Sequence, residues 1–401
     1  MNKGEPASVS RGNYFHRYLN YAISLLDHYH GNEPFHLYVK KYFSANKKHG
    51  SRDRKQISSL CYNYFRLGFG ASSLISIDEK LLLATFLIEN KPSAMLQNLK
   101  PEWNEKVHWS LQEKMETVKD IFTSAKIFPF NEDLGNEIDA DSFNWSFLVQ
   151  PKLFIRIRPG HQKRVTDQLK TAGVSFEKLS DSCLGFSNKE KISEMLKIDK
   201  EAVIQDYNSQ RSENLLLRQK DIAASEISVW DCCAASGGKS ILAFDLFKIR
   251  NLVVSDTRKN ILQNLRLRFE KAGIKEYTSF VADISLSEPG QKIKEPLDLI
   301  IADVPCSGSG TWARNPEQVS FFREKEIQRF AELQQKIVLN AVHYLKEGGF
   351  LLYITCSVFK RENEENTIYF QQETGLRLIQ SEYLKGYDIG ADTLFVALFR
   401  N

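Results

Sequence analysis

Residues 229–240 have the sequence VWDCCAASGGKS. An apolar run that stops at thiols and small residues is typical of a buried parallel strand leading into a helix. Two later stretches follow the same plan, residues 299–308 (LIIADVPCSG) and residues 351–357 (LLYITCS). Because ligands of an open α/β sheet bind beyond the carboxyl ends of its strands, we expect these three stretches to meet at one crevice.

The sequence around these stretches alternates between strand and helix patterns from about residue 215 onward. Strands are expected near 227–232, 251–256, 278–282, 297–303, 349–355, 374–380 and 393–400. Helices are expected between them, for example Lys259 to Ala272, stopped by Gly273, and Glu324 to Leu345, stopped by Gly348-Gly349. This alternation predicts an α/β fold with a doubly wound sheet over residues 213–401.

Two regions of different character precede this sheet. Residues 1–145 carry apolar residues at helical spacing and predict an all-helical domain. Residues 146–212 predict a small α/β module, in which residues 153–158 alternate like a strand. The two-residue period puts Arg156 and Arg158 on one face with Phe154, which would suit RNA, although a solvated sheet face would look the same.

Basic residues also cluster between the first two predicted helices. Lys47, Lys48, Arg52 and Arg54 lie in this stretch and are candidate phosphate contacts, with a solvated loop as the alternative. The whole chain of 401 residues carries a net charge of +4, which permits a polyanionic partner without proving one.

The remaining composition narrows the class of protein. The polar N-terminus and the lack of about 18 consecutive apolar residues lead us to expect a cytoplasmic protein with no membrane partner. Six cysteines occur without the spacing of a zinc site, so we expect free thiols and no metal. The oligomeric state does not follow from the sequence, and a monomer is our default expectation.

The first loop is a candidate ligand cradle because small residues follow a strand and open a helix. It matches neither a Walker loop, which needs glycine where Cys233 stands, nor a Rossmann fingerprint. Asp256 ends the next strand, where an acid can bond ribose hydroxyls, and Asp283 ends the strand after that. The alternative for each acid alone is a helix cap or a surface carboxylate.

Two cysteines stand at strand ends that deliver functional groups. Cys306 follows Pro305, and Cys356 lies between Thr355 and Ser357. A thiolate there would be a strong nucleophile under positive local potential, whereas most buried cysteines are inert packing. We take Cys232 and Cys233 as examples of the inert kind, although Cys233 borders the ligand loop.

Taken together, these motifs resemble the Sun/Fmu family of RNA cytosine-5 methyltransferases. The resemblance rests on residues 231–239 (DCCAASGGK), 303–310 (DVPCSGSG), 314–317 (RNPE), 355–357 (TCS) with 364–366 (EEN), and 205–210 (QDYNSQ). Residues 50–54 (GSRDR) are similar to the NusB-like helical region that some members carry. Ser236 replaces the family's usual Pro, and Val304 a usual Ala or Pro, but neither change removes a reacting group.

The resemblance implies a Rossmann-like class I methyltransferase sheet that binds S-adenosyl-L-methionine. The methionine end would lie on Cys233, Ala234, Ala235, Ser236, Gly237, Gly238 and Lys239, the ribose on Asp256, the adenine on Asp283, and Asp303 beside cofactor and base. Cys356 would be the nucleophile and Cys306 would help release the product. Flanking RNA would be held by Lys47, Lys48, Arg52, Arg54, Arg156, Arg158 and Arg314.

The implied chemistry explains a need for two thiols. A thiolate that adds to carbon 6 of cytosine makes carbon 5 nucleophilic, and a base must then remove the carbon-5 proton before the thiol leaves. Cys306 or a water are candidates for that base. The expected substrate is ribosomal RNA; a tRNA enzyme, a non-catalytic RNA-binding ribosome-assembly factor and a P-loop nucleotidase are the alternatives.

Overall fold

The computed structural model describes residues 8–287 and 289–401, so part of the polar N-terminal segment lies outside the described residues. Contacts divide the chain into two compact units. The first contains the residues up to 131 together with 139–150 and 312–322, and the second contains 132–138, 151–311 and 323–401. The domain limits expected from the sequence, at 145/146 and 212/213, stay predictions.

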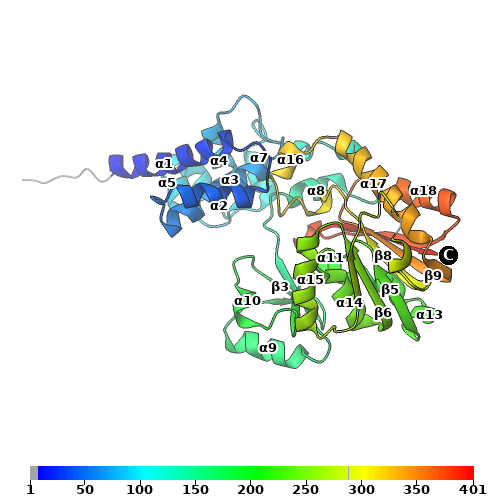
Figure 1. Ribbon diagram of the computed structural model, residues 1–401. Helices are drawn as coiled ribbons and strands as arrows, with labels where there is room; N and C mark the ends of the chain where they lie inside the picture. The colour runs from blue at the N-terminus through cyan, green and yellow to red at the C-terminus, as the bar shows by residue number, and fades with distance from the viewer. Residues whose placement is uncertain (1–7, 288) are drawn as a thin grey trace, which may run out of the picture. The chain divides into compact units, whose positions relative to one another are not determined.

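The first unit is helical, as its amphipathic periodicity predicts (Figure 1). Its helices are α1 (Ser8–Asp27), α2 (Phe35–Ala45), α3 (Ser51–Arg66), α4 (Ile77–Ile88), α5 (Ala94–Leu99), α6 (Pro101–Glu105), α7 (Leu111–Thr117) and α8 (Ala140–Ser146). The distant segment 312–322, with α16 (Gln318–Phe321), belongs to the same unit. The ring centroids of Trp312 and Phe128 are 5.7 Å apart there, and a Cβ on Gly31 would lie 2.6 Å from the Phe321 ring.

The second unit contains a seven-stranded sheet in the order β10-β11-β9-β8-β5-β6-β7. The strands are β5 (Glu226–Asp231), β6 (Lys248–Asp256), β7 (Thr278–Val281), β8 (Leu297–Asp303), β9 (Leu345–Thr355), β10 (Arg377–Leu384) and β11 (Leu394–Arg400). All neighbours pair in parallel except β11, which is antiparallel to β9 and β10. The sequence therefore predicted every strand of this Rossmann-like sheet, and the order reverses between β5 and β8, where α/β folds bind ligands.

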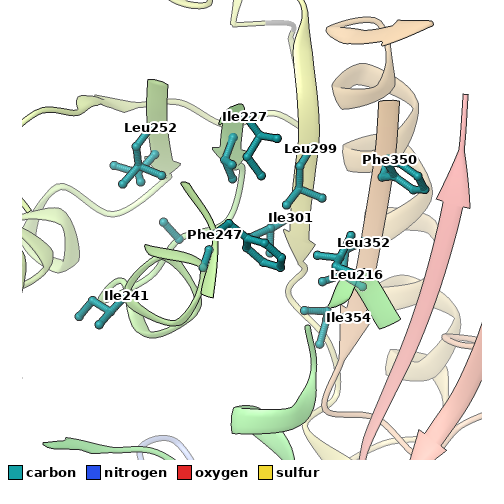
Figure 2. Close-up of a cluster of buried hydrophobic side chains, with 14 of the residues drawn as sticks. Leu216, Ile227, Ile241, Phe247, Leu252, Leu299, Ile301, Phe350, Leu352 and Ile354 are labelled. Atoms are coloured by element: carbon teal, nitrogen blue, oxygen red, sulfur yellow. The ribbon is translucent and has the colours of Figure 1, made fainter. Parts of the chain in front are cut away.

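Helices cover both faces of this sheet (Figure 1). They are α14 (Gly238–Leu246), α15 (Lys259–Ala272), α17 (Lys325–Val342) and α18 (Glu364–Thr374), with short α11 (Tyr207–Arg211), α12 (Asn214–Leu217) and α13 (Lys220–Ala223) leading into β5. Leu299 and Leu352 pack with Ile241 of α14 in one apolar cluster (Figure 2). The next residue along β9, Tyr353, points the other way and bonds Gln334 of α17. Alternate strand residues thus pack into the layers on opposite faces of the sheet, and this packing on both faces holds the strand ends in place.

A smaller four-stranded sheet in the second unit has the order β2-β3-β1-β4. It contains β1 (Leu153–Ile157), β2 (Glu177–Lys178), β3 (Cys183–Phe186) and β4 (Ala202–Ile204), with α9 (Gln162–Thr171) and α10 (Ile192–Met195). Strand β1 lies between β3 and β4, antiparallel to both. Ile155 and Ile157 face an apolar core with Val165 and Leu169 of α9.

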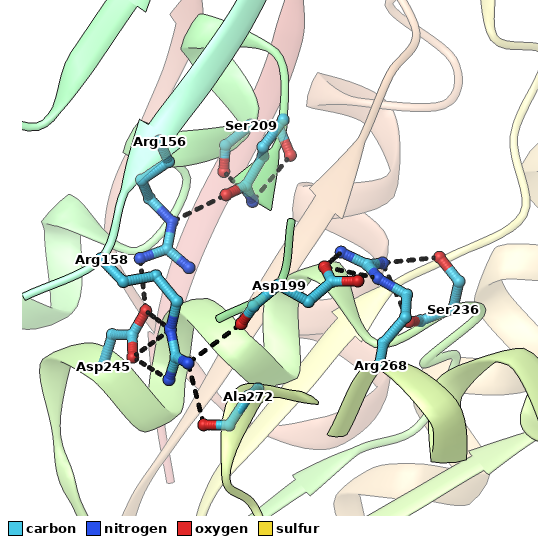
Figure 3. Close-up of polar contacts among 9 residues, drawn as sticks. Arg156, Arg158, Asp199, Ser209, Ser236, Asp245, Arg268 and Ala272 are labelled. Carbon is cyan, nitrogen blue, oxygen red and sulfur yellow. Dashed lines mark hydrogen bonds and ion pairs between the residues drawn. The ribbon is translucent and has the colours of Figure 1, made fainter. Parts of the chain in front are cut away.

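The expectation of a solvent-facing basic surface on β1 is wrong. Arg156 and Arg158 are only 5% and 8% exposed, and Figure 3 shows both pointing at Asp245 of α14. Arg156 Nη1 donates to Asp245 over 2.6 Å, and Arg158 Nη2 donates to it over 2.7 Å. The other face of β1 packs against the larger sheet's helices, so its polar residues pair internally instead of meeting solvent. We call Arg156 and Arg158 the buried arginine pair.

Two smaller expectations are also settled by the structure. Helix α17 ends at Val342 with His343 as its cap, so Gly348-Gly349 lie inside β9 and do not stop the helix. Helix α15 does end at Gly273, whose φ of 81° is left-handed. Among the described residues, no helix has both the length and the apolar character that crossing a membrane requires.

Candidate functional site

The small-residue loop between β5 and α14 forms a tight turn at the carboxyl end of the sheet. Gly237 has a φ of 82°, and a Cβ on it would lie 2.6 Å from the Phe269 ring of α15. Ala235 also has a positive φ, of 46°, and its N–H donates to Asp256. This backbone requires residues with a small side chain or none, which explains why the loop consists of alanine, serine and glycine.

Ser236, the departure from the usual family residue, is held by an arginine (Figure 3). Arg268 Nη1 donates to both the carbonyl oxygen and Oγ of Ser236 at 3.0 Å. The same guanidinium donates to Asp199, whose side chain lies in the loop before β4. The loop at Ser236 is therefore tied to α15 and to the small sheet through a side chain that proline does not offer.

A cavity of about 420 Å³ opens at the carboxyl ends of β5, β6, β7 and β8. Of the expected cofactor residues it is lined by Cys233, Ala235, Asp256, Asp283 and Asp303. Ala234, Ser236, Gly237, Gly238 and Lys239 shape the loop behind it and are not among the lining residues. The volume falls in the range of about 300–1,000 Å³ that is common for small-molecule sites.

Asp256 and Asp283 lie at two walls of this cavity. Asp256 is buried, accepts the Ala235 N–H at 3.0 Å and pairs with the exposed Arg258 guanidinium. Asp283 is exposed and accepts from the Ser285 hydroxyl at 2.6 Å. Both acids therefore stand beside the cavity as the strand positions predicted, with Asp256 the more rigidly oriented of the two.

Lys239 reaches from α14 toward Asp303 at the end of β8. Its Nζ donates to Ser209 Oγ at 2.8 Å and lies 3.3 Å from Asp303 Oδ2. Burial by itself would lower the pKa of Lys239, but the carboxylates of Asp303 and Glu213 and the Cys356 sulfur raise it above its ordinary value. A charged ammonium group is thus held beside the carboxylate and near the thiols.

The two candidate thiols meet next to this ion pair. Cys306 follows β8, Cys356 follows β9, and their Sγ atoms are 3.2 Å apart. Hydrogen bonding to the Cys356 sulfur, burial and the charge of Glu362 all raise the pKa of Cys306. Both side chains are half-buried, so the pair is reachable from solvent. The structure brings together the two thiols that the sequence singled out at strand ends.

Backbone contacts hold the two thiol-bearing loops in register. The Gly310 N–H donates to the Cys356 carbonyl oxygen at 2.9 Å, and a Cβ on Gly310 would collide with the Thr393 carbonyl oxygen. Ser309 Oγ accepts from the Val358 N–H at 2.9 Å. The glycine and serine residues after Cys306 therefore allow the two loops to pack closely.

The expected RNA contacts in the first unit have varied exposure. Lys47, Lys48 and Arg52 are exposed, and we call these three side chains the exposed basic cluster. Arg54 is half-buried, donates to the His49 carbonyl oxygen and lies over the Phe43 ring. Arg314 is half-buried within the 312–322 segment. An RNA role for these residues stays a prediction.

Sequence reasoning missed several residues that build the site. Thr257, Arg258, Ile284, Val304, Pro305 and Ile337 also line the cavity. Glu362 and Gln334 lie behind the thiols and bond each other at 2.7 Å. Glu362 belongs to the run RENEEN, where nothing in the pattern separates the fully buried Glu362 from the half-buried Glu364 and the exposed Glu365.

Comparison with known proteins agrees with this geometry. Residues 221–395 match the family model described as 16S rRNA methyltransferase RsmB/F, which corresponds to Sun/Fmu. Over this stretch, which is less than half of the chain, the protein is similar to the Sun/Fmu family. The family match covers β5 to β11 and contains the glycine-rich loop, the cavity acids and both thiols.

The alignments with individual relatives cover only part of each relative's length. The chain is 28% identical over 244 residues to ribosomal RNA small subunit methyltransferase B of Shewanella oneidensis, covering 58% of this chain and 54% of that protein. It is 30% identical over 174 residues to 28S rRNA (cytosine-C(5))-methyltransferase of Mus musculus, covering 41% and 20%. The chain thus spans about half the length of the Shewanella relative.

A solved structure shares the fold. The methyltransferase homolog protein from Pyrococcus horikoshii superposes with a TM-score of 0.55 at 19% identity, covering 68% of this chain and 93% of that one. At this identity the likeness shows the fold alone, a mostly parallel sheet with helices.

Proposed function

We propose that this protein is an S-adenosyl-L-methionine-dependent RNA cytosine-5 methyltransferase that acts on ribosomal RNA through a covalent bond between Cys356 and carbon 6 of cytosine. The observation that carries the proposal is the pair of thiols, 3.2 Å apart, beside the Lys239–Asp303 ion pair. The Sun/Fmu match and the names of the relatives supply the substrate class.

The residues around the cavity fit the proposed cofactor. Carboxylates of Asp256 and Asp303 face a space large enough for a nucleoside, and acids at these strand ends suit ribose hydroxyls and a positive sulfonium group. The loop at Ala235 and Gly237 leaves room for close backbone approach at the start of α14. When bound, S-adenosyl-L-methionine would supply an electrophilic methyl group at carbon 5 of the base.

Cys356 is the proposed nucleophile because the positively charged ammonium group of Lys239 interacts electrostatically with its sulfur. Its thiolate adds to carbon 6, and a new S–C bond forms as electron density moves onto the ring and toward carbon 5. Asp303 hydrogen-bonds the ring of the base and favours this addition. The Lys239 ammonium fixes the Asp303 carboxylate in place for that contact.

Cys306 is the proposed helper in product release. After methylation a base takes the proton from carbon 5, the electron pair of that C–H bond forms the ring double bond, and the C6–S bond breaks to return the Cys356 thiolate. Cys306 lies beside the sulfur that must leave. A cytoplasmic location would keep both thiols reduced, as this chemistry requires.

The exposed basic cluster is the proposed contact for flanking RNA. Lysine and arginine side chains at a surface bind phosphates with little sequence preference, and the target base must leave any duplex to reach a pocket. Single-stranded or loop RNA is therefore the expected form of the substrate.

The test uses RNA transcripts containing 5-fluorocytosine, which blocks loss of the carbon-5 proton and should trap the protein on RNA. We expect an adduct on a denaturing gel that survives Cys306→Ala and disappears in Cys356→Ala, with Cys61→Ala, a buried thiol of the first unit, as the control. Loss only in Cys306→Ala would reverse the two thiol roles. Adducts with tRNA but not with rRNA would make it a tRNA enzyme, and no adduct with either would favour a non-catalytic RNA-binding factor.

A further inference from the structure

Glu362 is a carboxylate that the proposed chemistry leaves unused, although it lies directly behind both thiols. Its side chain is fully buried, at 0% exposure, in the turn between β9 and α18. Oε2 accepts from the Ser307 N–H at 3.0 Å and from Gln334 Nε2 at 2.7 Å. Oε1 accepts from the Ser357 hydroxyl at 2.6 Å.

These contacts join the two thiol-bearing loops. Ser307 follows Cys306 directly, and Ser357 follows Cys356 directly, so one carboxylate bonds the next residue after each thiol. Gln334 extends the link, because its Nε2 also donates to the Pro305 carbonyl oxygen at 3.0 Å. Any shift of either loop would break a hydrogen bond to a buried carboxylate, which is costly.

The partners of Glu362 are neutral donors that suit an ionised carboxylate. Ser357 Oγ already accepts from the Phe359 N–H and from the Ser307 hydroxyl, so its own proton is left for Glu362. The Gln334 amide is oriented by Asn366, whose Nδ2 donates to Gln334 Oε1, so that Nε2 must face Glu362. Burial raises the pKa of Glu362 above its ordinary value, and the three donors oppose that shift because each favours the charged form.

The surroundings of the two thiols are therefore electrostatically unequal. The Glu362 charge raises the pKa of Cys306, after the larger effects of its contact with Cys356 and of burial. Lys239 interacts electrostatically with the Cys356 sulfur, which is one of the groups that raise the pKa of Lys239. The further ionisable groups nearby are the phenol of Tyr353, which faces Cys306, and the acids Asp303 and Glu213, which face Lys239. Two sulfurs 3.2 Å apart cannot both carry a charge cheaply, so this inequality decides which one does.

We propose that Glu362 is a positioning residue that locks the Cys306 and Cys356 loops together and keeps the negative charge of the thiol pair on Cys356. The inference rests on the proposed function, since it explains why Cys356 and not Cys306 attacks the base. Glu362 itself touches no reacting atom, and it acts through Ser307 and Ser357.

The experiment measures alkylation of each thiol by iodoacetamide, with neither RNA nor cofactor present, by mass spectrometry of the two cysteine peptides. In the unaltered protein Cys306, whose pKa is raised, should react more slowly than Cys356 at the same pH. Glu362→Gln keeps the side-chain shape but removes the charge, and should speed alkylation of Cys306 about tenfold, because losing the neighbouring negative charge raises the thiolate fraction.

Two further variants separate charge from shape. Glu362→Asp keeps the charge and should preserve faster reaction at Cys356. Glu364→Gln removes a carboxylate two residues away, which bonds Tyr383 and the Asn136 N–H and neither thiol loop, and should change neither rate. Urea unfolding of each variant shows whether it is folded, and rates in 6 M urea give the unstructured reference.

An unchanged ratio of the two rates in folded Glu362→Gln would overturn the proposal. If that variant does not fold, equal reactivity of Cys306 and Cys356 across the pH profile of the unaltered protein would overturn it instead. Because alkylation needs no RNA, a missing 5-fluorocytosine adduct with an intact rate difference would reject the proposed function and leave the Glu362 inference standing.

Discussion

The buried arginine pair and the exposed basic cluster are both conspicuous runs of positive charge, yet they lie in opposite surroundings. The pair is under 10% exposed and shares the carboxylate of Asp245. The cluster is exposed, and Lys48 also lies over the Tyr21 ring. The pair therefore joins the small sheet to α14 within one unit, whereas the cluster remains available to a polyanion. Charge alone does not reveal which role a basic residue has.

The largest expected effect comes from neutralising the centre of the buried pair. Asp245→Asn would leave two buried guanidinium groups without a counter-charge, and should lower the free energy of unfolding by about 3–5 kcal/mol. Urea denaturation followed by circular dichroism measures the change. Asp181→Asn is the matched control, since Asp181 pairs with Lys178 at the surface, and its midpoint should stay unchanged. A similar midpoint for both variants would remove the distinction between the pair and a surface contact.

An intermediate effect, on RNA and not on stability, is expected for the exposed basic cluster. Replacing Lys47, Lys48 and Arg52 by alanine together should weaken rRNA binding about tenfold or more near 0.1 M salt, and should reduce the salt dependence by about two to three counterions. Filter binding over a salt series gives both quantities.

The control for that experiment removes the same number of exposed charges elsewhere. Lys271, Lys275 and Lys294 are exposed on the second unit, and their triple alanine variant should bind RNA nearly as well as the unaltered protein. Equal losses in the two triple variants would mean that only net charge matters and that the cluster has no special place.

The smallest expected effect concerns a third arginine, Arg268, which combines features of the buried arginine pair with a contact to the glycine-rich loop. Arg268 pairs with the buried Asp199, like the buried pair, but its other contacts reach the cofactor loop at Ser236. Ser236→Ala removes one acceptor and leaves the carbonyl contact, so S-adenosyl-L-methionine affinity should fall by only about two- to tenfold, the worth of one hydrogen bond. Calorimetry measures it. An unchanged affinity would show that the carbonyl contact alone holds the loop.

Much of the seven-stranded sheet was predictable because buried parallel strands have continuous apolar sequences. The ends of β8 and β9, and with them Asp303, Cys306 and Cys356, followed from where those runs stop. The cavity acids Asp256 and Asp283 followed from the same rule. Local pattern sufficed because each of these residues is placed by the strand that carries it.

Other features depended on contacts between distant parts of the chain. Period-two alternation correctly put Arg156 and Arg158 on one face of β1, but only the packing of α14 against that face decided that it is buried. The segment 312–322 closely follows the Cys306 loop in sequence, and yet it packs with Tyr29 and Phe65 in the helical unit.

The sequence by itself determined the order of the strands along the chain, the cofactor-loop backbone and the identity of the two thiols, because strand periodicity, glycine geometry and residue chemistry are local properties. The tertiary structure alone decided the 3.2 Å approach of the sulfurs and the burial of Glu362 behind them. Both depend on β8 and β9 being neighbours and on α17 supplying Gln334. Burial and pairing of polar groups arise from elements far apart in sequence, so no local pattern reveals them.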